Sequence, residues 1–289
     1  MIMTDEQKNC FAVSANKQKK QFKRNKKEYK RLSEHIGLLP LVMISPADTE
    51  LIQGGSEERR RFMDLIISQQ DKNYLHALIQ YNKALLQRNT LLKEQSHDTS
   101  LFDVLEMQLT MYGEQIFSKR KQLIERLVPL FNQFHQQICH SAESVNLTYI
   151  SQLEETSLEE KLRKNRERDV LIGYTTAGIH KDELEMLLDG SLIRRVGSQG
   201  QQKTYLIALK LAQYSLLAQE GASTPLLLLD DIFDKLDAER VAQIIHLVGE
   251  EQFGQIFITD TNRKYLDKIL ETINSDFALF EVEQDVSNP

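Results

Sequence analysis

Two adjacent carboxylates directly follow a run of four leucines in the 289-residue chain. Leu226–Leu229 is succeeded by Asp230 and Asp231. The apolar run predicts a buried strand, and ligands of open α/β sheets bind beyond the carboxyl ends of the strands. At such a position Asp230 could hold Mg²⁺ and Asp231 could polarise an attacking water. The simpler alternative is a core strand that ends in a solvated acidic turn, with Asp237 as the N-cap of the next helix.

A second candidate for phosphate chemistry is the run Ser198-Gln199-Gly200-Gln201-Gln202, at the start of a predicted amphipathic helix. Ser198 can cap that helix. Gly200 lets a phosphate approach the backbone, where free N–H groups and the helix dipole favour an anion. A plain capped helix start is the alternative. Because Ser198 lies 28 residues before Leu226, with one helix between them, the two candidates can belong to one site.

The charge of the chain is unevenly distributed. The net charge is −6, yet the segment 17–31 holds nine Lys and Arg and one acid, which leaves 27 bases against 41 acids elsewhere. Phe22 and Tyr29 interleave with these bases, a composition that suits salt-sensitive and weakly sequence-dependent binding to DNA phosphates. A solvated hairpin or amphipathic helix is the alternative. The candidate DNA-binding residues of this segment are Lys19, Lys20, Lys23, Arg24, Lys26 and Lys27.

Three further bases, Arg59-Arg60-Arg61, stand at the start of a predicted long helix. Bases at a helix N-terminus oppose the helix dipole, so we expect them to meet an acidic partner, either carboxylates of the protein or DNA. Arg59 and Arg60 are therefore also candidate DNA-binding residues.

Glycine, proline and apolar spacing predict the elements that must position these residues. Between residues 56 and 172 the only helix breakers are Gly113 and Pro129, which predicts long packed helices with a short extended piece at Val145–Ile150. Both flanks alternate strands with helices, which predicts an α/β fold with a largely parallel sheet. The predicted strands are Cys10–Ser14, Leu38–Ile44, Glu183–Leu188, Ser191–Arg195, Leu226–Leu229, Gln255–Thr259 and Phe277–Val282. The predicted C-terminal helices are Gln199–Gln219, Ala238–Gly249 and Tyr265–Ile273.

Composition and the termini narrow the class of protein. A hydrophobic fraction of 41% with 27% charged residues is typical of a globular chain. No apolar run reaches the roughly 20 residues of a membrane span, and the N-terminus has no secretory h-region, so we expect a cytoplasmic protein with no membrane partner. Cys10 and Cys139 are expected as buried thiols, and the histidines show no metal-ligand spacing, so neither a disulfide nor a metal site is predicted from these residues.

Several motifs, in order along the chain, resemble the RecF family of SMC-like recombination mediators, which have an ABC-type ATPase head. The resemblance covers residues 10–260. The family pattern usually has Pro, Arg and Pro where this chain has Ile179, Lys181 and Ser56, which are mild departures. The motifs that carry the resemblance are Pro46-Ala47-Asp48, Leu51–Ser56, Arg59–Asp64, Gln87-Arg88-Asn89, Gly178–Asp182, Ser198–Gln202 and Leu229–Asp237.

The resemblance implies an α/β fold: an ABC/SMC-like ATPase head with a mostly parallel sheet, plus an inserted helical arm. The implied domains are an N-terminal part of the head at 1–45, the arm at 46–168 and the C-terminal part of the head at 169–289. Asp230 would be the Mg²⁺ ligand and Asp231 the catalytic carboxylate of the Walker B motif, and Asp237 would belong to the D-loop. The signature residues, which would face a nucleotide bound by a second subunit, are Ser198, Gln199, Gly200 and Gln201.

The same resemblance implies ATP and Mg²⁺ as cofactors and an ATP-dependent homodimer. It implies action on gapped DNA or single-strand/double-strand junctions, with RecO- and RecR-like mediators, in recombinase loading. One departure is large: no P-loop motif G-x-x-x-x-G-K-[ST] occurs in the 289 residues, so we expect the chain to lack the first strands and P-loop of its family. ATP hydrolysis by this chain therefore stays open.

Two alternatives come from other classes of protein. One is a non-catalytic DNA- or partner-binding module, which the missing P-loop favours. The other is an ABC ATPase with another task, such as transport or long-coil SMC work. The predicted arm argues against that second alternative, because roughly 40 helical residues give a length of only about 60 Å.

Overall fold

The fold comes from a computed structural model, which describes residues 2–4, 10–15, 20–29, 31–96, 98–139, 143–221, 223–234, 236–249, 252–260 and 278–280. The described strands are β1 (Ile2–Thr4), β2 (Cys10–Ala15), β3 (Lys20–Arg24), β4 (Lys27–Glu28), β5 (Leu41–Ile44), β6 (Val145–Ile150), β7 (Glu183–Leu188), β8 (Ser191–Leu192), β9 (Leu226–Asp230) and β10 (Ile256–Thr259). The described helices are α1 (Glu50–Gln53), α2 (Ser56–Gln70), α3 (Lys72–Lys93), α4 (Thr99–Cys139), α5 (Leu158–Ile172), α6 (Ile193–Val196), α7 (Gln199–Glu220) and α8 (Ala238–Val248). The predicted helix 265–273 and most of the predicted strand 277–282 lie outside the described residues.

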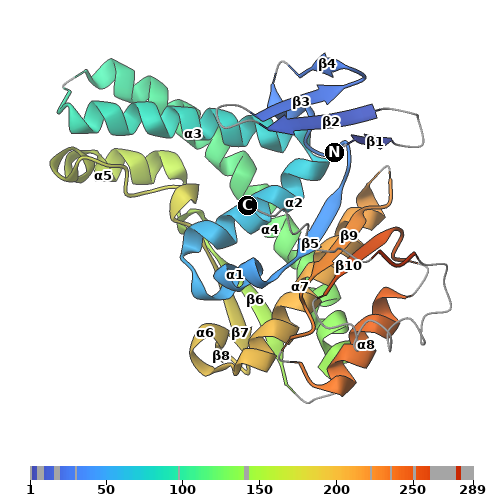
Figure 1. The fold of residues 1–289 in the computed structure, drawn as a ribbon. Coiled ribbons are helices and arrows are strands. Elements are labelled where there is room, and N and C mark those ends of the chain that lie inside the picture. The colour runs from blue at the N-terminus through green and yellow to red at the C-terminus, as the bar shows by residue number, and fades with distance from the viewer. Residues whose placement is uncertain are drawn as a thin grey trace, which may run out of the picture.

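Three parallel strands form the sheet that carries the Asp230–Asp231 pair. β9 lies between β5 and β10, and Leu229 is in register with Ile44 on one side and Ile258 on the other (Figure 1). Leu227 and Leu229 are buried, and α7 packs against β5. The predicted parallel α/β sheet is thus confirmed, with Asp230 as the last residue of its central strand.

Two antiparallel sheets accompany the parallel one. β1, β2, β3 and β4 pair in that order as an N-terminal antiparallel meander, because strands that are close in sequence can pair antiparallel with few residues between them. β6, β7 and β8 form the other sheet, in which β6 pairs with β7 from Val145 opposite Leu188 to Ile150 opposite Glu183. The alternation of strands and helices predicted a largely parallel sheet, but two of the three described sheets are antiparallel.

Two predicted strands are shorter in the structure. The strand predicted at 191–195 ends at Leu192, because the one-turn helix α6 begins at Ile193 and that side chain is buried in the core. The strand predicted from Leu38 begins at Leu41. Pro40 has no N–H to give to a ladder, but its carbonyl accepts a hydrogen bond from the N–H of Leu226 at 2.9 Å.

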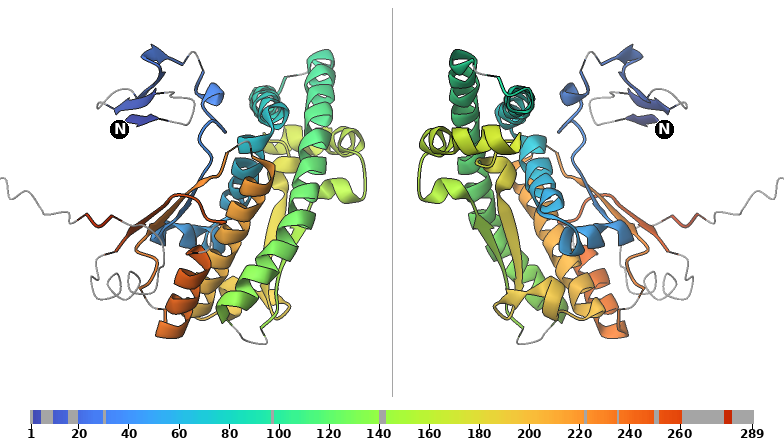
Figure 2. Two further views of the ribbon diagram at one scale, coloured as in Figure 1. Left: turned by 90° about the vertical axis from the view of Figure 1, so that its right-hand side faces the viewer. Right: turned by 90° about the vertical axis from the view of Figure 1, so that its left-hand side faces the viewer.

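The predicted helical segment forms α2 to α5, of which α4 is the longest with 41 residues. At 1.5 Å per residue this helix is about 60 Å long. Figure 2 shows it running from the end of the molecule that carries α3 to the end that carries α8. Gly113 stands where α4 meets α3 and the start of α5. A Cβ there would lie 2.7 Å from Leu158 Cδ2 and 3.3 Å from Tyr81 Cε2, so glycine permits this close packing.

One buried apolar cluster links the predicted arm with the predicted head. It includes Leu127 and Phe131 of α4 together with Tyr205 and Leu209 of α7. α4 packs along α7, and β6, which precedes residue 168, pairs with β7, which follows it. The sheet and the core therefore cross the predicted boundary at 168/169.

None of the described helices combines the length and apolar character that a membrane crossing requires.

Candidate functional site

The paired carboxylates lie at the carboxyl edge of the parallel sheet, beside the end of β10. The Thr259 hydroxyl donates a hydrogen bond to Asp230 Oδ1, and the Asp231 N–H donates to the Thr259 carbonyl at 3.0 Å. Asp231 has φ +49°, in the left-handed region that Asp tolerates better than most residues. Carboxylate and hydroxyl oxygens suit Mg²⁺. The chemistry of this edge therefore fits the predicted metal ligand, Asp230, with Asp231 next to it.

Thr259 is the last residue of β10. Because its hydroxyl is bonded to Asp230, a change at the end of β10 would reach the carboxylate directly.

The start of α7 has the geometry of a capping box. Ser198 Oγ accepts a hydrogen bond from the Gln201 N–H at 3.2 Å, and the Gln201 side-chain oxygen accepts from the Ser198 N–H at 2.8 Å. Ser198 and Gln199 are exposed. A 22-residue helix begins here, so the positive end of its dipole lies at the position where the sequence predicted an anion. The capped helix start is present, and the phosphate contact stays a prediction.

Side-chain contacts tie this helix start to its surroundings. Gln202 accepts a hydrogen bond from the Gln53 amide at 2.6 Å, and its own amide donates to the Gly197 carbonyl at 2.8 Å. Lys203 Nζ donates to the carbonyl of Asp234 at 2.6 Å. The first turn of α7 therefore touches the loop that follows the Asp230–Asp231 pair, which brings the two predicted motifs into one region.

Asp237 and Lys210 complete this region. The Asp237 carboxylate accepts a hydrogen bond from the Arg240 N–H at 2.9 Å, so it is the N-cap of α8, as the simpler interpretation predicted. Lys210, which the sequence did not single out, lies 2.7 Å from Asp48 Oδ1 and donates to the Met43 carbonyl at 3.2 Å. This lysine fastens α7 to the end of β5.

The basic segment forms a hairpin rather than a helix. Arg24 and Lys27 pair across a two-residue turn, Asn25-Lys26, in which both residues have positive φ, as type I′ turns require. Lys26 and Lys27 are exposed, whereas Lys23 and Arg24 are half-buried. Lys20 begins β3, and Lys19 lies outside the described residues.

The two aromatic residues of this segment pack against the protein. The rings of Phe22 and Tyr29 lie 5.5 and 5.3 Å from the ring of His35. Burial lowers the pKa of His35. Because both aromatic rings pack against a neighbouring side chain of the protein, Phe22 and Tyr29 have a structural role in holding the hairpin.

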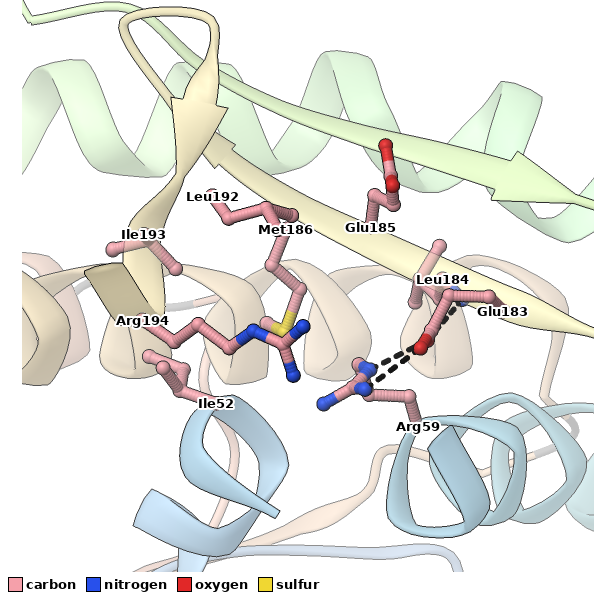
Figure 3. Close-up of a pocket in the computed structure, with 9 residues that line it drawn as sticks. All are labelled: Ile52, Arg59, Glu183, Leu184, Glu185, Met186, Leu192, Ile193 and Arg194. Atoms are coloured by element: carbon pink, nitrogen blue, oxygen red, sulfur yellow. Dashed lines mark hydrogen bonds and ion pairs between the residues drawn. The ribbon is translucent and has the colours of Figure 1, made fainter. Parts of the chain in front are cut away.

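Arg59 is also corrected, because its acidic partner is a carboxylate of the protein. Its guanidinium is 5% exposed, makes two bonds to Glu183 at 2.6 and 2.8 Å, and donates to the Gly54 carbonyl at 2.9 Å. Figure 3 shows this pair at a hollow between α1, α2 and the β7–β8 hairpin, with Arg194 alongside. This geometry leaves Arg59 no exposed donor edge for DNA.

Arg60 is half-buried and donates to the Asp182 carbonyl at 2.8 Å. Burial lowers the pKa of its guanidinium, with a further contribution from Arg120. The neighbouring Arg61 is exposed. The DNA contact of Arg60 therefore stays a prediction.

Comparison with known proteins places these features in a family. No family model matches the chain. The DNA replication and repair protein RecF of Parabacteroides distasonis is 70% identical over 279 residues, which are 96% of this chain and 76% of the relative. The chain belongs to the RecF family. The RecF of Bacteroides fragilis strain NCTC 9343 is 59% identical over 93% of this chain and 73% of the relative.

Solved structures agree with this RecF assignment. The recombination mediator protein RecF-ATP in the RecFOR pathway superposes with a TM-score of 0.78 at 30% identity, over 88% of this chain and 71% of that one. A Smc head domain from Pyrococcus furiosus, at 16% identity and a TM-score of 0.51, covers 92% of this chain and 68% of that one. The fold is therefore that of RecF and SMC-type ATPase heads.

Several RecF-like motifs have structural roles that sequence reasoning missed. Arg88 is fully buried and bonds to Glu106, to Asp169 at 2.7 Å and to the Thr175 hydroxyl at 2.8 Å, so it joins α3, α4 and α5. The sequence feature that could have predicted this buried role is that Arg88 lies among the apolar residues of a helix face that packs on the core.

His180, in the Gly178–Asp182 motif, is half-buried and also bonds within the protein. Its Nδ1 lies 2.8 Å from the Tyr81 hydroxyl, and its Nε2 lies 3.1 Å from the Thr175 carbonyl. A carbonyl can only accept, so Nε2 carries the proton and Nδ1 accepts from Tyr81. Burial lowers the pKa of His180 to about 4. His180 therefore has a structural role, between Tyr81 and Thr175.

Proposed function

We propose that this RecF-family protein acts in replication-linked repair of gapped DNA. It binds at single-strand/double-strand junctions and helps load a recombinase together with RecR- and RecO-like mediators. The support is the family itself: the relatives are named DNA replication and repair protein RecF. The solved relative is a recombination mediator of the RecFOR pathway.

The nucleotide part of the proposal rests on the exposed capping box at the start of α7, which is the observation that carries it. Ser198, Gln199, Gly200 and Gln201 offer their helix start to the γ-phosphate of ATP held by a second head. Asp230 would hold Mg²⁺, Asp231 would orient the attacking water, and Asp237 would belong to the D-loop. In a full-length version with a P-loop, ATP bound between two heads would hold the dimer on DNA, and Asp231→Asn is expected to prolong that ATP-bound dimer.

The DNA part of the proposal rests on the hairpin of β3 and β4. Lys26 and Lys27 are exposed at its tip, and Lys23 and Arg24 lie on the adjoining strand. Lysine and arginine at such a tip can neutralise phosphates without reading bases. Lys19, Lys20 and Arg60 stay in the proposal as candidate DNA contacts from the sequence, and Arg59 is left out because it is buried against Glu183.

A second candidate function is a non-catalytic DNA- or partner-binding role. The observation that favours it is the absence of a G-x-x-x-x-G-K-[ST] motif from the 289 residues. This candidate is a fragment that cannot bind ATP. Binding of ATP by the isolated protein, measured by equilibrium dialysis, tests it: saturable ATP binding would exclude a fragment that cannot bind ATP.

The DNA surface is tested by fluorescence anisotropy of a labelled gapped duplex over a range of salt concentrations. The variant combines Lys26→Asn with Lys27→Gln, since Asn tolerates the left-handed backbone at position 26. Loss of two phosphate contacts is expected to reduce the slope of log affinity against log salt by roughly 2.

The matched control removes two charges elsewhere. Arg194→Gln with Arg195→Gln changes two exposed arginines of α6, which lies at the other end of the molecule from β4 (Figure 1). The control is expected to retain the wild-type slope. An equal loss in both variants would show that DNA responds to overall charge and not to the hairpin.

A further inference from the structure

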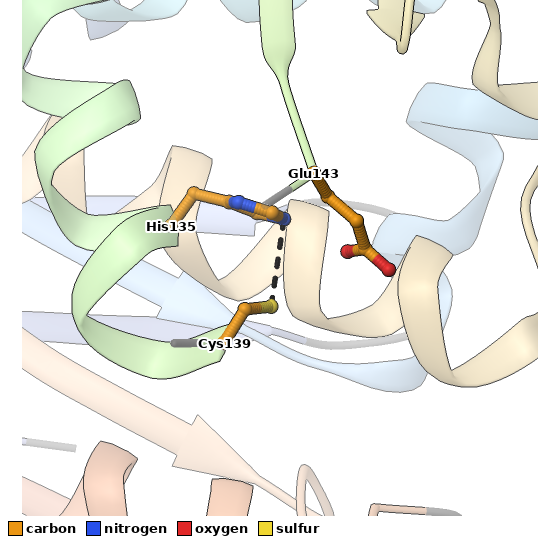
Figure 4. Close-up of side chains that lie close together, drawn as sticks. All are labelled: His135, Cys139 and Glu143. Carbon is orange, nitrogen blue, oxygen red and sulfur yellow. Dashed lines mark hydrogen bonds between the residues drawn. The ribbon is translucent and has the colours of Figure 1, made fainter. Parts of the chain in front are cut away.

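Three side chains with different metal-binding atoms meet at the end of α4. His135 and Cys139 are four residues apart and therefore lie on one helix face, with His135 Nε2 3.6 Å from Cys139 Sγ. Glu143 approaches them just before β6 begins (Figure 4). One nitrogen, one sulfur and one carboxylate oxygen of these residues all lie within 4.8 Å of one another.

His135 is held firmly in the protein interior. Its side chain is 3% exposed. A neutral imidazole has one nitrogen lone pair to give. The rings of Phe131 and Tyr205 pack beside it at 6.2 and 6.5 Å, which fixes its position.

The Glu143 carboxylate has one oxygen bonded and one oxygen unused. Oε1 accepts a hydrogen bond from the Gln201 amide at 2.9 Å. Oε2 is buried, and none of the residues that the structure describes donates a hydrogen bond to it. A buried carboxylate oxygen without a donor is costly, and a cation next to it removes that cost.

We propose that His135, Cys139 and Glu143 bind one divalent cation of the zinc class. Zinc takes nitrogen, sulfur and oxygen ligands at about 2.0–2.3 Å in a tetrahedron, which separates ligand atoms by roughly 3.3–3.6 Å. The Nε2–Sγ distance of 3.6 Å matches this spacing. The Cys139 thiol loses one proton on binding, and water takes the fourth position.

The site would also steady the signature motif. Glu143 would share its oxygens between the cation and Gln201, and Gln201 is the residue that completes the capping box with Ser198. A bound cation would therefore hold the start of α7 through a single carboxylate. This consequence rests on the proposed function, whereas the cation site itself does not.

Co²⁺ and Zn²⁺ binding to the purified, chelator-treated protein tests the proposal. We expect one Co²⁺ per chain, with the near-ultraviolet charge-transfer absorption of a thiolate–cobalt bond and the visible bands of tetrahedral Co²⁺. Zn²⁺ should displace the Co²⁺ and abolish both. No saturable binding of one ion per chain would overturn the site. The measurement needs neither ATP nor DNA, so its outcome is separate from that of the proposed function.

Matched variants assign the ligands. Cys139→Ser should abolish the charge-transfer absorption, and Glu143→Gln should weaken Zn²⁺ affinity at least tenfold, on the order of the losses seen when metal sites are altered. Cys10→Ser, which changes the other cysteine of the sequence, should leave the spectrum unchanged. Charge-transfer absorption retained in Cys139→Ser, or lost in Cys10→Ser, would overturn the proposal. Both test variants are nearly isosteric, and circular dichroism of the metal-free proteins verifies that they fold.

Discussion

Arg120 makes the most demanding test of how the arm is fastened. Its side chain is 2% exposed and bonds to Asp64 of α2 and to Asp182 at 2.9 Å each, and it donates to the Ile179 carbonyl at 2.9 Å. The Asp182 side chain has no exposed surface. Arg120→Met removes the charge and keeps the bulk, so a buried carboxylate loses its cation.

The expected cost follows from this burial. Removing one partner of a buried ion pair costs about 3–5 kcal/mol of unfolding free energy, because the other charge stays behind. Arg120→Met combined with Asp182→Asn should recover about 1–3 kcal/mol of that loss, because the charge in the fully buried position is gone. Arg163→Met is the control. Arg163 is 76% exposed and pairs with Glu159 on the surface, so its removal should cost less than about 0.5 kcal/mol.

The cost should also depend on pH in a defined direction. Burial raises the pKa of Asp182 even with Arg120 present, and removal of Arg120 raises it further. In Arg120→Met the folded protein keeps Asp182 protonated, whereas the unfolded chain releases that proton above about pH 4. The loss of unfolding free energy therefore grows as pH rises from about 4 through the raised pKa of Asp182.

Urea unfolding followed by circular dichroism at about pH 5 and about pH 7 measures these differences for Arg120→Met and its control. A penalty below about 1 kcal/mol at about pH 7, or one that shrinks as pH rises, would refute the reasoning.

Two further predictions concern backbone packing and a buried histidine. Gly113→Ala should destabilise the protein by about 1–2 kcal/mol despite the better helix propensity of alanine, because the new Cβ would lie 2.7 Å from Leu158 Cδ2. A thermal unfolding midpoint equal to or above that of the wild type would contradict this prediction. Burial lowers the pKa of His180 to about 4. The contribution of neutral His180 to the free energy of unfolding is therefore complete above the unfolded pKa of about 6.5, and up to about 3 kcal/mol of it is lost as pH falls toward 4. The stability difference between the wild type and His180→Gln should therefore shrink from about pH 7 to about pH 5 in urea unfolding, and a constant difference would argue against a neutral His180.

Local patterns predicted the elements that carry the nucleotide motifs. The four leucines before Asp230 gave a central parallel strand, and Ser198 with Gln201 gave a capped helix, because each depends on residues only a few positions apart. The Asp189-Gly190 turn between β7 and β8 was likewise readable, since both residues adopt positive φ.

Long-range pairing set the limit of the sequence prediction. The sequence could not exclude Arg59 as a DNA contact, because its carboxylate partner Glu183 is 124 residues away and no local pattern predicts the pair. The same holds for Arg120, whose partner Asp182 is 62 residues away. His135 and Cys139 have helical spacing in the sequence, but Glu143 lies beyond the end of α4, so helical spacing does not place it beside them.

The central claim is that the start of α7 completes an ATP site on another RecF head. Its most direct test mixes this protein with a RecF that carries a complete P-loop but whose own signature serine is replaced, and measures association by sedimentation velocity with and without ATP. We predict an ATP-dependent complex that Ser198→Arg abolishes and that Ser215→Arg, a change further along the same helix, leaves intact. Association that needs no ATP, or that Ser198→Arg leaves unchanged, would contradict the account.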